Sequence, residues 1–218
     1  MQHKTSIAAK IALLASAAML TGCAFVPDTV HPEYKPSANI SVIPGANAVD
    51  LAVVVKNEKT HPKTVSVTLD GYGIPMAGVY MNVQKDFQKA FINALKSRGF
   101  SINEKSPDKF GVAVIHFYLK EQQHFSAPSH TGYAVLHLLI KRNGSTFFSQ
   151  TFSAHTKFWQ NGVAITTFGR QKTAEITLNK IVNKIVTDPQ VIDALFKAAG
   201  KTPPADLGVT VPASVASH

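Results

Sequence analysis

The only cysteine of the chain lies where a lipid can be attached to it. Cys23 ends the motif LTGC at residues 20–23, which follows a basic start and an uncharged, largely apolar run at residues 11–20. This order is typical of a secretion signal that ends in a lipobox. Small residues before the cut let an extended segment enter a peptidase, and the thiol can carry a thioether-linked diacylglycerol. The sequence therefore predicts a signal peptide at residues 1–22 and Cys23 as the acylated N-terminus.

The same segment allows one alternative, an ordinary cleaved signal. The apolar run is too short to span a bilayer, which needs about 20 residues. An ordinary signal would not need the only cysteine at this position, so lipidation is favoured. A diacylglycerol and an N-acyl chain on Cys23 would hold the protein stably, whereas a single chain holds only marginally. In enteric bacteria an aspartate after the lipidated cysteine commonly retains a lipoprotein at the inner membrane. Because Ala24 occupies this position here, we expect an anchor in the outer membrane of a two-membrane host, with the domain facing the periplasm.

Histidines on two expected strands are the candidates for metal chemistry. His116 and His137 are expected opposite the most apolar residues of their strands, where a cross-strand pair could bind a metal if a third ligand approached. No cysteine cluster, His-x-x-x-His pair or nearby carboxylate completes such a site, so structural histidines and no metal are favoured. His124 and His130 flank an expected loop, which is either a binding loop or, as we favour, a mobile connection.

No pattern in the sequence predicts catalysis. The chain has no Gly-x-Ser-x-Gly elbow, and its thiol is committed to lipid. The acidic residues lie on different expected elements, so no carboxylate pair is placed for general acid and base work. The glycine cluster at residues 71–73 lacks the Lys-Ser/Thr of a phosphate loop. We expect a non-enzymatic protein with no catalytic residues and no cofactor beyond the acyl chains of Cys23.

The charge of the chain is positive. It has 22 Lys and Arg against 13 Asp and Glu, a net charge of +9, and loss of residues 1–22 removes two lysines and leaves +7. The positive residues are scattered, and an exported protein rarely meets nucleic acid, so we expect no nucleic-acid partner. Anionic lipid, a glycan such as lipopolysaccharide or peptidoglycan, or an acidic envelope protein are better candidates. Since no free thiol would remain, a packed core must supply the stability.

Aromatic residues gather in the last expected strand and allow two interpretations. In the first, three of them fill the core beneath the helices: Phe148, Phe152 and Phe158. In the second, an exposed aromatic patch docks an envelope protein, because exposed apolar clusters mark interfaces. The candidate docking residues are Phe147, Trp159, Tyr118 and Tyr133.

Hydrophobic periodicity predicts the elements that position these residues. The strands are expected at residues 50–56, 64–69, 111–120, 133–141 and 147–159. The core face of the third strand is expected to carry Ala113, Ile115, Phe117 and Leu119. Asn143-Gly144 predicts a tight type I′ hairpin before the last strand. Helices are expected from Val83 to Gly99, from Arg170 to Thr187, and from Asp188-Pro189 onward. Asn82 can cap the first of these helices. Its single apolar stripe consists of Val83, Phe87, Ala90, Phe91, Ala94 and Leu95.

One-sided helices and alternating strands together predict an α+β fold of two layers, with helices packed on one face of a mainly antiparallel sheet. We expect one periplasmic domain at residues 49–199. Residues 23–48 are expected to form the lipid anchor, at Cys23, and an extended tether, because this stretch contains four prolines and no apolar periodicity. Residues 200–218 are expected to be a disordered tail.

The order of these elements resembles the YajG family of uncharacterised Gram-negative lipoproteins. The residues that carry the resemblance are the lipobox, the helix ending ALKSRGF, the strand GVAVIHFYL and the closing LNKIVNKIVTDPQVIDAL, over about residues 50–196. The resemblance implies an α+β periplasmic domain on an outer-membrane anchor, similar in layout to accessory lipoproteins of envelope machines. It transfers no functional residue beyond Cys23. The proline-containing C-terminal tail and the histidine-rich strands depart from the family pattern.

Three classes of function remain open at this point, of which an enzyme is the least favoured. The first is a structural or accessory component of an envelope assembly, such as a secretion or transport machine. The second is a periplasmic module that binds a lipid or glycan between helix and sheet. A deep apolar cleft along residues 83–95 would favour ligand binding, whereas a filled core with a flat aromatic patch would favour docking.

Overall fold

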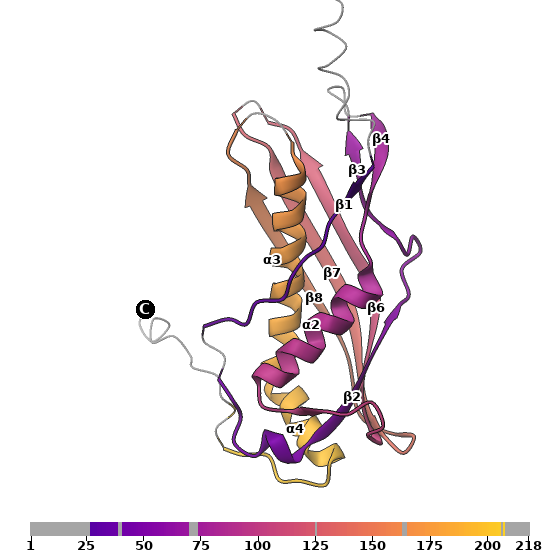
Figure 1. Cartoon of the computed structure of the whole chain (residues 1–218), viewed down its shortest axis with the longest axis vertical. Helices are drawn as coiled ribbons and strands as arrows, with labels where there is room; N and C mark the ends of the chain where they lie inside the picture. The colour runs from indigo at the N-terminus through magenta and orange to yellow at the C-terminus, as the bar shows by residue number, and fades with distance from the viewer. Residues whose placement is uncertain are drawn as a thin grey trace, which may run out of the picture.

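The computed structural model describes residues 27–38, 41–69, 74–124, 126–162, 165–205 and 207, so the expected signal peptide and Cys23 lie outside the described residues. Within them the chain forms two sheets and three α-helices (Figure 1). One sheet has the order β5 (Ser101–Ile102), β2 (Asp50–Asn57), β6 (Asp108–Gln122), β7 (Ser129–Arg142), β8 (Ser145–Trp159). The other has the order β1 (Asp28–Thr29), β4 (Pro75–Tyr80), β3 (Thr64–Leu69). The helices are α2 (Val83–Ser97), α3 (Thr167–Val186) and α4 (Pro189–Ala198), and a short 3₁₀ turn, η1, spans Ala46–Ala48.

The expected α+β class is confirmed, but both sheets are mixed. Strands β6, β7 and β8 are antiparallel neighbours as expected. Strand β2, however, runs parallel to both β5 and β6, and β1 runs parallel to β4. The chain crosses over through α2 between β2 and β6, and a crossover of this kind joins parallel strands. Of the three valines in β2, Val53 and Val55 are buried on the helix side, whereas Val54 is 43% exposed on the other face.

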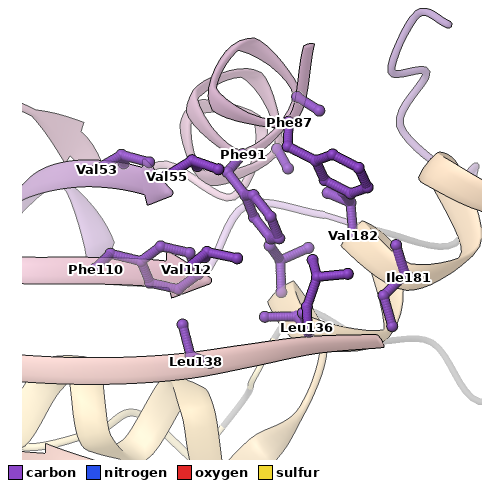
Figure 2. Packing of buried hydrophobic residues seen from close by; sticks show 14 of the residues in the cluster. Val53, Val55, Phe87, Phe91, Phe110, Val112, Leu136, Leu138, Ile181 and Val182 are labelled. Atoms are coloured by element: carbon purple, nitrogen blue, oxygen red, sulfur yellow. The ribbon is translucent and has the colours of Figure 1, made fainter. Parts of the chain in front are cut away.

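The helices lie together on one face of the five-stranded sheet (Figure 1) and bury their apolar stripes there. Every residue of the stripe expected on α2 is buried. Phe87 contacts Phe117 edge-on at 5.3 Å between ring centroids, and Phe91 lies 5.4 Å from Phe110. Figure 2 shows how these rings from α2 meet the sheet residues beside Ile181 of α3. The layer between helices and sheet is therefore filled with side chains.

A β-bulge in β6 corrects the expected core face of this strand. The register with β7 shifts between Val114 and His116. Before the shift, the buried residue is Val114, and after it Phe117 is buried. Ile115, expected inside, is 45% exposed, and Ala113 is only partly buried. The alternation changes face because the bulge places two residues of one strand opposite one of the other.

Local signals at the ends of elements are confirmed. Asn143 and Gly144 have φ values of 49° and 87°, as a type I′ turn requires at both central positions. Asn82 caps α2 by accepting a hydrogen bond from the Lys85 amide. The side chain of Asp188 caps α4, in which Pro189 occupies the first turn.

The segment expected as a tether is extended, but its described part lies along the domain. Asp28 pairs with Val79 of β4, and Val30 is fully buried. Tyr34 donates a hydrogen bond to the Asn183 side chain of α3 over 2.6 Å. Apolar side chains between the prolines supply the burial that holds this segment down. At the other end, residues 200–205 and 207 have no regular structure, and the remainder of the expected tail lies outside the described residues.

Candidate functional site on the open face of the sheet

The face of the five-stranded sheet opposite the helices carries exposed apolar side chains. All three described helices lie on the other face (Figure 1). The exposed apolar residues of its strands are Val54 (43%), Ile115 (45%), Tyr133 (39%), Phe147 (44%) and Trp159 (52%). Because no helix in the described part of the chain covers this face, it is a candidate for contact with another molecule.

Two of the expected docking residues meet near the middle of this face. Tyr118 of β6 is directly opposite Tyr133 of β7, which is opposite His155 of β8. The Tyr133 and His155 rings stack at 4.7 Å between centroids. His116 lies 6.3 Å from Tyr118, and the neighbouring Ile115 is exposed because of the bulge. We call these five residues the central patch.

The structure does not bring all four expected docking residues together. Phe147 and Trp159 lie at opposite ends of β8, twelve residue steps or roughly 40 Å apart along an extended strand. The Trp159 ring contacts the His124 ring at a tilt of 40°, with 5.0 Å between ring centroids, near the start of β7. Phe147 follows the β7–β8 hairpin. The expected docking residues therefore lie in three places: Tyr118 and Tyr133 in the central patch, and Phe147 and Trp159 at the two ends of β8. An extended strand separates residues that are only twelve positions apart in the sequence.

On β6, β7 and β8 the charged side chains of this face have one sign. The outward positions of β6, β7 and β8 carry lysine and histidine but no Asp or Glu. Register places Lys109 beside Lys141, and Thr131 between Lys120 and Lys157. Lys157 lies over the Trp159 ring, with its Nζ 4.4 Å from the ring centroid. A partner with acidic groups would complement this surface.

The two histidines considered for metal binding are not opposite one another. Register pairs His116 with Val135 and His137 with Ala113. Both ring nitrogens of His137 contact hydroxyl groups of β8: Nδ1 lies 3.0 Å from Thr151 Oγ1 and Nε2 lies 3.2 Å from Ser149 Oγ. In the described part of the chain, no three His, Cys, Asp or Glu residues are grouped to hold a metal ion.

The free edge of β8 is partly protected by lysines of α3. Lys180 donates to the carbonyl of His155 over 2.9 Å, and Lys184 donates to the carbonyl of Ser153 over 3.0 Å. Lysines are a common protection of edge strands against pairing with another chain. The face of the sheet is therefore a better candidate contact than its edge.

A buried ion cluster under the helices was not expected from the sequence. Arg170 of α3 donates to both oxygens of Glu121, from Nε over 2.5 Å and from Nη2 over 3.2 Å. Its Nη1 also donates to Asp28 over 3.1 Å. The Glu121 side chain is 1% exposed. The sequence holds one signal for this cluster: Glu121 continues the alternation of the inward-facing residues Phe117 and Leu119, which predicts a buried carboxylate.

His130, expected beside a loop, is buried in β7 next to this cluster. Its Nε2 lies 3.1 Å from Gln160 Oε1. A Cβ on Gly169 of α3 would come within 2.3 Å of the same ring nitrogen, so only a glycine lets the helix approach this closely. Burial lowers the pKa of His130, and the charge of Arg170 lowers it further, while Glu121 and the Gln160 hydrogen bond oppose this.

The lowered pKa of His130 predicts a loss of stability in mild acid. The unfolded chain, with an ordinary histidine pKa of about 6.5, binds the proton more readily than the folded state. The contribution of neutral His130 to the free energy of unfolding should therefore be fully present above this pH and should decrease as the pH falls below it. Urea unfolding at about pH 7.5 and about pH 5 measures the difference. A His130→Gln variant should lose less stability between these pH values, and an equal loss in variant and parent would contradict the prediction.

A pocket of about 430 Å³ lies at the start of α2, and its lining includes Thr29, His31, Tyr80 and Met81. It lies beside the first turn of the helix. Further along, the apolar face of α2 is filled, since Phe87 and Phe91 are fully buried. Residues 83–95 thus meet the sheet through a packed core.

None of the described helices is both long enough and apolar enough to cross a membrane. The sequence model of a family described as uncharacterised lipoproteins matches residues 36–195. No curated protein matches the chain.

Several solved structures resemble the chain at low sequence identity. A protein of Xanthomonas campestris is 15% identical with a TM-score of 0.47, and the match covers 73% of this chain and 91% of that one. A minor lipoprotein of Acinetobacter baumannii is 11% identical with a TM-score of 0.40, covering 73% and 97%. A lipoprotein of Neisseria meningitidis is 13% identical with a TM-score of 0.31, covering 62% and 99%.

Proposed function

We propose that the chain, which belongs to this family of uncharacterised lipoproteins, is a non-catalytic structural or accessory component of an envelope assembly. Diacylglycerol and an N-acyl chain on Cys23 would anchor it, in the outer membrane of a two-membrane host, with the domain in the periplasm. The LTGC motif at residues 20–23 and the family match support the anchor. A secretion or transport machine is the kind of assembly that we propose.

The observation that carries the docking role is the open sheet face. Its central patch combines Tyr118, Tyr133 and Ile115 with two histidines, and the outward positions of β6, β7 and β8 add lysines without an acidic residue. Partly exposed aromatic rings on a rigid sheet are suited to a protein interface, because they bury much apolar area at little cost in conformational entropy. We propose an envelope protein with an acidic surface as the partner.

The finer placement of the chain beside the YajG family is also a proposal. It is supported by the segments quoted above from residues 94–100, 111–119 and 178–195, which form the end of α2 with the following turn, much of β6 and the α3–α4 pair.

The alternative function is a periplasmic lipid- or glycan-binding module. The pocket at the start of α2, beside Thr29 and His31, is the observation that favours it. The filled core along the rest of α2 favours docking instead.

A charge on the central patch tests the docking role. Tyr133→Glu removes a half-exposed ring and repels an acidic partner, so we expect crosslinked partner recovery from intact cells to fall by about thirtyfold or more, as for loss of a hot-spot residue worth about 2 kcal/mol. Val42→Glu is the matched control, because Val42 is 64% exposed and lies beside Gly99, outside the strands of the sheet. Equal recovery of the same proteins from both variants, with both domains folded, would remove the docking role from this patch.

A further inference from the structure

Exposed aromatic residues lie at the end of the domain where β4 begins and β8 ends. Trp159, the last residue of β8, is 52% exposed, and Phe168, in the first turn of α3, is 64% exposed. Phe168 packs edge-on against Phe158 at 6.3 Å between ring centroids. These residues flank the connection from β8 to α3. The core beneath the helices does not use the rings of Trp159 and Phe168.

Contacts in the ion cluster fix this end of the domain to the N-terminal segment. Arg170, two residues after Phe168, is bound to Asp28. Gln160, next to Trp159, accepts a hydrogen bond from Thr166 over 3.0 Å. In Figure 1 the start of α3, the end of β8 and the start of β4 lie at the upper end of the domain, and β1 runs parallel to β4.

The length of chain before Asp28 limits how far this end can stand from the anchor. Five residue steps separate Asp28 from Cys23, and an extended chain of that length spans at most about 17 Å. Asp28 pairs with Val79, which is four residue steps, or about 13 Å, from the start of β4 at Pro75. An acylated Cys23 could therefore lie only a few ångströms beyond the start of β4, and its acyl chains must enter the bilayer.

The side chains at this end suit a lipid surface. Trp and Phe rings are favoured at the boundary between headgroups and acyl chains, where one part of the ring is apolar and its rim is wet. Lys157 covers the Trp159 ring, and Lys120 lies in the same row of the sheet. Cations in this position would face anionic headgroups.

We propose that Trp159, Phe168 and Lys157 dock onto the lipid headgroups of the membrane that holds Cys23. The domain then stands on the bilayer by this end, and the open sheet face points sideways, where a neighbouring envelope protein can reach the central patch. This inference rests on the proposed lipid anchor, but it does not require the docking role of the patch.

The single tryptophan of the chain makes the contact measurable. The acylated protein is reconstituted into vesicles of phosphatidylethanolamine and phosphatidylglycerol, with or without bromine near the headgroup end of the acyl chains. The matched control is the double variant Trp159→Phe, Phe147→Trp, which moves the only tryptophan to the other end of β8. We expect bromine to cause a large loss of emission from Trp159, together with a blue shift, and little change in the control.

Flotation of the same vesicles separates the outcomes. Protein that floats with the vesicles while Trp159 is quenched no more than the control tryptophan would overturn the membrane contact and leave the anchor standing. The vesicles contain no partner protein, so Trp159 would then remain a candidate contact for a partner protein and not for lipid. Protein that does not float would overturn the anchor, and the membrane contact with it.

Discussion

Replacement of Arg170 by methionine is expected to destabilise the domain by about 3–5 kcal/mol, the usual cost of breaking a buried ion pair from one side. Arg170 is 8% exposed and satisfies both oxygens of Glu121, whose side chain is 1% exposed. Without the guanidinium, Glu121 keeps a buried charge with no compensating cation or must bind a proton. Urea unfolding near neutral pH measures the effect as a lower midpoint at an unchanged slope.

Two further variants test whether the loss of stability is specific to the buried cluster. The double variant Arg170→Met, Glu121→Leu should recover much of the lost stability, because replacing a whole buried pair by apolar residues is often close to neutral. Lys35→Met removes a pair with Glu175 in which the lysine is largely exposed, and it should leave the midpoint near that of the parent. A midpoint for Arg170→Met as high as that for Lys35→Met would contradict the role of the cluster.

Elements whose signals are local could be predicted from the sequence. The helix at residues 83–97 follows from its apolar stripe and the Asn82 cap, and the hairpin follows from Asn143-Gly144, which adopts the positive φ values that the turn requires. These signals involve residues a few positions apart, so neighbouring strands do not alter them.

Features that depend on pairing could not be predicted in this way. The bulge at residues 114–116 exists only relative to β7, so periodicity alone placed Ile115 inside. The parallel pairing of β2 depends on the path of the chain through α2. The four expected docking residues do not form one patch, because Phe147 and Trp159 share one strand and are separated along its length.

The buried cluster was missed for a similar reason. Asp28, Glu121 and Arg170 lie far apart in the sequence and come together only when β1, β6 and α3 pack. The inward position of Glu121 was the available signal. The same contacts explain why a stretch rich in prolines lies along the domain.

Cys23→Ser is expected to move the protein from the membrane fraction to the soluble extracytoplasmic fraction. Cys23 is the only cysteine, so no other thiol can take the lipid. Each buried methylene of an acyl chain contributes about 0.8 kcal/mol, and two or three chains make the attachment stable, so their loss should be close to complete release. Cell fractionation checks this, with circular dichroism of the variant as the control for folding.

Metabolic labelling with palmitate is the most direct test of the account, because it detects the lipid on the protein itself. The account predicts a labelled parent protein and an unlabelled Cys23→Ser variant that no longer sediments with membranes. An unlabelled parent, together with a variant that sediments with membranes as the parent does, would contradict the anchor from which the proposed function and the membrane contact both follow.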